Sequence, residues 1–125
     1  MSIYFQTHEY RCPCGCGLDS LDYSVLEKLD RARTKVGFPI SLSSGCRCRT
    51  YNTQIGGSAL SAHTPDYNGR THAVDVRCVH SLTRWKLVNA FLEVGFDRIE
   101  VCDKHIHVDN AEHLPHPAFL WGKSK

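Results

Sequence analysis

The chain has 125 residues, of which 42% are hydrophobic and 22% are charged, and its formal net charge is +2. This length suits a single domain with one core, and the composition is that of an ordinary globular protein. The small charge gives no reason to expect a nucleic-acid partner, and the apolar stretches are too short to span a bilayer. We therefore expect one domain over residues 1–125, present as a monomer.

The first residues, MSIYFQTHEYRC, do not contain a charged segment followed by an apolar one. A secretory signal needs both, so none is visible. We expect synthesis in a cytoplasm without a signal peptide, wherever the protein finally acts.

Two stretches have the apolar spacing of amphipathic helices. The first is 18–37, with Asp19 or Ser20 as N-cap and Gly37 as its end. The second is 81–95, capped by Ser81 and ended by Gly95. Its expected buried stripe consists of Leu82, Trp85, Val88, Phe91 and Leu92.

Other stretches alternate in polarity as strands do. A short strand is expected within 38–45, then loops around a short helical turn over 45–70, then a strand over 72–78. Stretches 98–102 and 105–109 are separated by two residues, which predicts a hairpin. The tail over 111–125 is expected to be irregular. The predicted fold class is α+β, with a small, mostly antiparallel sheet and helices packed beside it.

Two of these strands have one polar face and one apolar face. In HIHVD, the residues His105, His107 and Asp109 alternate with Ile106 and Val108. Asp75 similarly faces away from two valines, and an isolated buried carboxylate is costly. If the strands are neighbours, Asp75 and His107 converge, and a loop can bring in His63.

Two imidazoles and one carboxylate with an open fourth position are typical of a catalytic zinc site. Bound Zn²⁺ lowers the pKa of its water to roughly 7 and would balance the charge of Asp75. A histidine on a sheet face more commonly makes ordinary hydrogen bonds, so spacing alone leaves both interpretations open.

The motifs taken in order resemble those of the zinc D-Ala-D-Ala carboxypeptidase family, which includes phage endolysins and shares the Hedgehog/DD-peptidase fold. The matching segments are SSGCRCRTYNTQIGG (43–57), SAH (61–63), HAVDV (72–76) and HIHVD (105–109). The resemblance covers about residues 5–110. It implies a zinc peptidase that acts on the peptide stems of bacterial peptidoglycan.

Carried over by position, the resemblance implies His63, Asp75 and His107 as zinc ligands. Arg47 would bind a substrate carboxylate, for which the guanidinium group is well shaped, and Ser61 would line the cleft. Asn52 with the Gly56–Gly57 pair would shape the loop. Asp109 would orient a ligand histidine.

The chain departs from the family pattern in two places. The interval from His63 to Asp75 is longer, which leaves His72 as a second-choice ligand. Lys104 occupies the position where many relatives carry the catalytic base. Asp103 is our first candidate for the base and Glu100 the alternative, while His105 could stabilise the developing oxyanion. If no carboxylate reaches the site, the domain would bind zinc without cleaving.

Seven cysteines are present, and five of them fall in two clusters: Cys12, Cys14, Cys16, Cys46 and Cys48. Their Cys-x-Cys spacing differs from that of common zinc knuckles. They predict a second, structural Zn²⁺, or disulfides formed in an oxidising compartment, or reduced thiols. Cys78 and Cys102 are expected to be buried strand residues.

The sequence therefore favours a peptidase with one catalytic Zn²⁺, of the D-Ala-D-Ala carboxypeptidase or the L-Ala-D-Glu endopeptidase type. As a phage endolysin it would act at the cell wall or in the periplasm. The alternative is a non-catalytic zinc-binding module of the same fold, such as a phage-tail protein. A zinc-dependent nucleic-acid binder is disfavoured by the charge.

Overall fold

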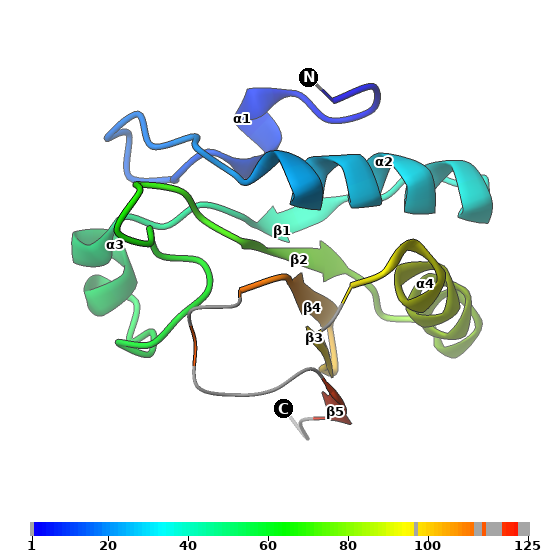
Figure 1. Ribbon diagram of the computed structural model, residues 1–125. Coiled ribbons are helices and arrows are strands. Elements are labelled where there is room, and N and C mark those ends of the chain that lie inside the picture. The colour runs from blue at the N-terminus through cyan, green and yellow to red at the C-terminus, as the bar shows by residue number, and fades with distance from the viewer. Residues whose placement is uncertain (1, 97, 112–113, 115–118, 123–125) are drawn as a thin grey trace.

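The computed structural model describes residues 2–96, 98–111, 114 and 119–122, and it confirms an α+β fold (Figure 1). Along the chain the elements are α1 (Thr7–Tyr10), α2 (Tyr23–Val36), β1 (Leu42–Ser44), α3 (Arg49–Gln54), β2 (Ala73–Arg77), α4 (Ser81–Val94), β3 (Arg98–Val101), β4 (His105–Asp109) and β5 (Phe119–Gly122).

The five strands form one sheet in the order β1-β2-β4-β3-β5. All neighbours are antiparallel except β3 and β5, which run parallel. The predicted hairpin is β3–β4, and it leaves Asp103 and Lys104 in the connecting turn. Strand β4 therefore lies in the middle, between β2 and β3, and Asp75 is paired directly with His107.

Helix α2 begins and ends at well-defined caps. The carboxylate of Asp22 accepts a hydrogen bond from the backbone N–H of Ser24, and Gly37 closes the helix with a φ of 75°. The expected end is confirmed. The expected N-cap, Asp19 or Ser20, is wrong because the chain first makes an isolated bridge between Leu21 and Thr71, and only then enters the helix.

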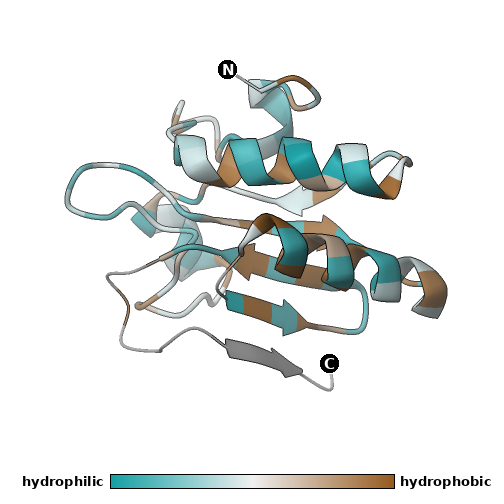
Figure 2. Cartoon of the chain, turned by 45° about the vertical axis from the view of Figure 1, so that its right-hand side comes forward, coloured by the Kyte–Doolittle hydropathy of each residue, from teal (hydrophilic) through white to brown (hydrophobic). Residues whose placement is uncertain are grey.

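Helices α2 and α4 cover one face of the sheet (Figure 2). The core lies between these helices and the sheet. Fully buried residues come from both helices and from the apolar face of the central strands: Val25, Leu29, Leu87, Phe91, Val74, Val76, Ile106 and Val108. The polar residues of β2 and β4 are consequently on the opposite face, which neither helix covers.

The buried stripe of α4 differs from the predicted one. Leu87, Ala90, Phe91 and Val94 are buried, whereas Leu82, Trp85 and Leu92 are 65%, 66% and 50% exposed. Val88 is half-buried. The predicted cap, Ser81, is the first helical residue, and His80 occupies the cap position without a side-chain hydrogen bond. Only Phe91 belongs to both the predicted stripe and the buried one.

The tail is not wholly irregular. Phe119–Gly122 adds a strand to the free edge of β3, so the expectation of an irregular segment over 111–125 is wrong there. The stretch Phe-Leu-Trp contains residues that favour strands, but it is too short to show a period in the sequence.

Candidate metal centre

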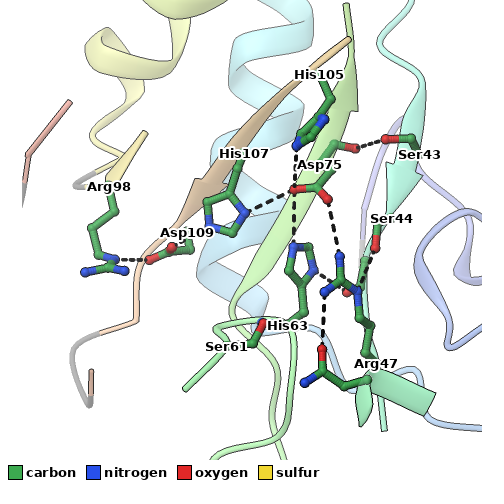
Figure 3. A network of polar contacts seen from close by, with 12 residues as sticks. Ser43, Ser44, Arg47, Ser61, His63, Asp75, Arg98, His105, His107 and Asp109 are labelled. Carbon is green, nitrogen blue, oxygen red and sulfur yellow. Dashed lines mark hydrogen bonds and ion pairs between the residues drawn. The ribbon is translucent and has the colours of Figure 1, made fainter. Parts of the chain in front are cut away.

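The polar face of β2 and β4 carries the residues that the sequence predicts as a site (Figure 3). The oxygen Oδ1 of Asp75 lies 3.2 Å from Nε2 of His63 and 3.0 Å from Nδ1 of His107. The two imidazole rings meet edge to face, with their centroids 5.1 Å apart. Residues from a loop and two strands therefore converge on one carboxylate oxygen.

His63 is held by the loop that precedes β2. Its backbone N–H donates to the hydroxyl of Ser61, and its ring nitrogen Nδ1 lies 2.7 Å from the carbonyl oxygen of Gly45. A carbonyl oxygen can only accept, so Nδ1 carries the proton. The other nitrogen, Nε2, is thereby directed at Asp75. The hydroxyl group of Ser61 therefore contacts the backbone of His63, within the same loop.

His107 is oriented from behind by a second carboxylate. Its Nε2 lies 2.7 Å from Oδ2 of Asp109, which is fully buried. Arg98 donates from Nε to the other oxygen of Asp109 at 2.7 Å. A histidine whose outer nitrogen donates to a carboxylate is common around protein metals, because the contact fixes the ring and its tautomer. The sequence predicts this role for Asp109, whereas Arg98, the first residue of the neighbouring strand β3, is a support that the motifs do not indicate.

The pKa values of the three groups in the cluster are shifted in different directions. Burial lowers the pKa of His63 below its usual value, so this ring is neutral. Burial alone would raise the pKa of Asp75, but hydrogen bonds with His107 and His63 outweigh it and keep the carboxylate ionised. Burial opposes the charge of His107 as well, yet bonds with Asp109 and Asp75 raise its pKa to about 9.

These contacts fit a metal cation. With its proton on Nδ1, neutral His63 presents a lone pair at Nε2 to Oδ1 of Asp75, and a metal cation between these two acceptors would satisfy both. The three ligand atoms all lie within 4.8 Å of one another. Tetrahedral Zn²⁺ with bonds near 2.0–2.1 Å would set ligand atoms about 3.3 Å apart, close to the separations observed.

Arg47 lies beside this cluster and is half-buried. Its guanidinium group donates to Ser44, to Asn52 and to Oδ2 of Asp75, the last at 3.5 Å. Asn52 is 3% exposed and also donates to the carbonyl oxygen of Ser58. A Cβ atom at Gly57 would lie 2.1 Å from Oδ1 of Asn52, so only glycine fits there. From the sequence, the Asn and Gly-Gly motif is expected only to shape the loop. In the structure it also positions Arg47.

The three candidates for proton transfer and oxyanion binding occupy different places. His105 is half-exposed on the same face of β4, with Nε2 3.9 Å from Oδ1 of Asp75. Glu100 is paired directly with His107 across β3 and β4, and paired residues share a face. Asp103 is exposed in the hairpin turn, four residues before His107 and about 13 Å from it along an extended chain.

His72, the second-choice ligand, is engaged elsewhere. Its Nε2 lies 2.8 Å from Oδ2 of Asp66, and its Nδ1 lies 3.0 Å from Oδ1 of Asn110. These contacts fasten the loop before β2 to the end of β4. The longer interval between His63 and Asp75 therefore holds a tethered loop.

The structure brings Cys12, Cys14, Cys16 and Cys48 together, with their sulfur atoms all within 4.8 Å. Cys46 does not join them. Its thiol is buried 3.0 Å from the hydroxyl of Thr71, and burial raises its pKa to about 11. Cys78 and Cys102 are buried, as expected, but each lies directly after the end of a strand, β2 and β3 respectively, and not within it.

Among the residues described, no helix combines the length and the apolar character that crossing a membrane requires.

Comparison with known proteins gives a match at the level of the family. A search of curated proteins found no matching sequence. The family described as Peptidase M15 matches residues 3–109, which include every residue of the cluster on β2, β4 and the His63 loop. The match spans most of the chain and ends at Asp109, the carboxylate that holds His107. This chain therefore belongs to the peptidase M15 family of zinc-dependent metallopeptidases.

Proposed function

We propose that this chain hydrolyses the peptide stems of bacterial peptidoglycan and that His63, Asp75 and His107 hold its catalytic zinc. The observation that supports this most directly is the meeting of two imidazole nitrogens at one buried carboxylate oxygen, with Arg47 next to it. A closed structural zinc site would present four protein ligands, whereas these three leave one position for water or substrate.

When bound, the zinc would polarise the scissile carbonyl and lower the pKa of a water molecule. The chain supplies the geometry for this. Gly45 and Asp109 each hold the outer nitrogen of one histidine, so Nε2 of His63 and Nδ1 of His107 already point at Asp75, and His107 would lose the proton that it carries on Nδ1 when zinc binds. Asp75 contributes the negative charge that makes the site selective for a cation.

Arg47 would bind a carboxylate of the substrate. A guanidinium group has five N–H donors, and the described contacts of Arg47 with Ser44, Asn52 and Asp75 use three of them. Donors therefore remain for an anion next to the metal. Both candidate bonds suit this arrangement, because a terminal D-Ala and a γ-linked D-Glu each carry a free carboxylate just after the scissile amide.

For the proton transfer we propose Glu100, with Asp103 as the alternative. Glu100 lies directly across the sheet from His107 and on its face, whereas Asp103 is exposed in the turn. His105 would donate a hydrogen bond to the developing oxyanion, since it lies on the open side of Asp75.

Mass spectrometry of purified peptidoglycan fragments, incubated with zinc-loaded protein, tests the function. Loss of one terminal alanine, absent with His107→Ala, would identify a carboxypeptidase. Release of the stem peptide after its first residue would identify an endopeptidase. Unchanged fragments in both samples would contradict the proposal and favour a non-catalytic zinc-binding module.

A pair of matched variants tests the base. Glu100→Gln should lower kcat by about 10²–10⁴-fold with zinc content unchanged, because a general base contributes that much. Asp103→Asn should retain most of the activity. The reverse ranking would assign the proton transfer to Asp103 and contradict the choice of Glu100.

A further inference from the structure

The four clustered thiols come from two segments that are far apart in the sequence. Cys12, Cys14 and Cys16 follow α1, and Cys48 occupies the cap position of α3. The sulfur atoms of Cys12 and Cys14 are 3.5 Å apart, and those of Cys14 and Cys48 are 3.6 Å apart. The cluster therefore joins the N-terminal segment to the beginning of α3.

Local backbone geometry turns these sulfur atoms toward one point. Gly15 has a φ of 86°, which lets the chain reverse between Cys14 and Cys16. Backbone N–H groups donate to sulfur twice, from Cys48 to Cys12 and from Tyr51 to Cys48, each at 3.4 Å. Such bonds stabilise a sulfur atom that carries negative charge, as a metal-bound thiolate does.

We propose that Cys12, Cys14, Cys16 and Cys48 bind a structural zinc ion, separate from the catalytic one. Four thiolates around Zn²⁺, with bonds near 2.3 Å, would lie about 3.8 Å apart, close to the separations observed. A disulfide would require sulfur atoms about 2.05 Å apart. Four thiol ligands form a closed set with no position for substrate, so this ion is structural.

The zinc would fasten the segment that carries Arg47. Cys46 donates from its backbone N–H to the carbonyl oxygen of Tyr10 at 2.7 Å, and Arg47 donates likewise to His63 at 2.9 Å. Residues 45–48 are thus held between the N-terminal segment and a ligand of the catalytic site. That this anchoring helps Arg47 to bind substrate rests on the proposed function, whereas zinc binding by the thiols does not.

Metal analysis of the whole chain, purified under reducing conditions with zinc, tests the proposal. The wild type should contain two zinc ions per chain. The double variant Cys14→Ser/Cys16→Ser should lose one, and since both side chains are exposed it should still fold, which circular dichroism checks. The matched control, Cys78→Ala, removes a thiol outside the cluster and should keep both ions.

A second variant makes the result independent of catalysis. His63→Ala/His107→Ala should retain one zinc ion, and its X-ray absorption spectrum should show four sulfur neighbours at about 2.3 Å. Cobalt in the same variant should give an intense thiolate-to-metal charge-transfer band.

Three results would overturn the proposal. One is a wild type that contains a single zinc ion together with a histidine variant that contains none. Another is a protein two hydrogens lighter under non-reducing conditions, which would show a disulfide among the cluster. The third is iron in place of zinc. None of them would affect the proposed peptidase activity, which depends on the other site.

Discussion

At the scale of single residues, the position of Arg47 depends on the absence of one methyl group. Gly57→Ala would place a Cβ atom 2.1 Å from Oδ1 of Asn52 and force that amide away from Arg47. We expect KM for a peptide with a free carboxylate to rise on the order of tenfold, with zinc content unchanged, because a charge-assisted contact is weakened. Steady-state kinetics would measure this, and Asn52→Ala should reproduce it. An unchanged KM in both variants would show that Arg47 is held by other contacts.

A second prediction at this scale concerns Asp109. Asp109→Asn removes the negative charge behind His107 and replaces the charged acceptor of the Arg98 hydrogen bond with a neutral amide. Zinc affinity should fall by about 10–100-fold, as it does when such supporting carboxylates are changed. Competition with a chromophoric chelator would measure the affinity. Zinc binding as tight as in the wild type would mean that His107 is oriented without this contact.

The residues that meet at the site were largely predictable from the sequence, and so was part of what supports them. Alternation in β4 put His105, His107 and Asp109 on one face, and the structure has them there. The carbonyl of Gly45 leaves no comparable signal, because its contact with His63 joins segments that only the tertiary fold brings together. The pairings of Glu100 with His107 and of Arg98 with Asp109, by contrast, follow from the register that the predicted two-residue turn imposes.

At the scale of elements, α4 shows why a helical period does not identify the buried face. The helix carries two apolar stripes, one containing Leu87, Phe91 and Val94 and another containing Leu82, Trp85 and Leu92. Both stripes have helical spacing, so the pattern predicts a helix correctly but cannot choose between them. The choice is made by tertiary packing against α2 and the sheet.

A pair of substitutions separates the two stripes. Phe91→Ala should lower the free energy of unfolding by about 3–5 kcal/mol, because this ring is fully buried. Trp85→Ala should change it by only about 0.5 kcal/mol, as expected for an exposed position. Urea unfolding would measure both. Equal losses would show that the exposed stripe is also packed.

The loop before β2 gives a prediction about pH. A hydrogen bond with His72 lowers the pKa of Asp66 from 3.8 to about 2. A carboxylate with a lowered pKa stabilises the folded state fully above the unfolded value and loses this effect as pH falls through the folded value.

Asp66→Asn should therefore be less stable than the wild type at pH 7, and the difference should shrink as pH falls from about 4 to 2. Urea midpoints of both proteins, measured without metal, would show this. A difference that stays constant over that range would contradict the role of the Asp66–His72 pair.

At the scale of the whole molecule, the sequence predicted helices packed beside a sheet but not the order of the strands in that sheet. Two helices beside a mostly antiparallel sheet follow from composition and period, and the match over residues 3–109 confirms the resemblance at the level of the peptidase M15 family. The arrangement β1-β2-β4-β3-β5 depends on pairings between distant segments, and so does the meeting of the two cysteine segments. These long-range pairings leave no local periodicity to read.

The central place of β4 has a consequence for the exchange of amide hydrogens. Ile106 and Val108 are core residues, and they alternate in one strand with His105, His107 and Asp109 of the metal face. Their N–H groups exchange only when the strand opens, and such an opening would also release a metal held by His107. Zinc should therefore slow exchange at Ile106 and Val108 by the same factor by which it lowers the unfolded population, 1 + [L]/Kd. Protection in β4 that did not change with zinc would mean that the strand opens without losing the ion, and the core and the site would then be separate units of stability.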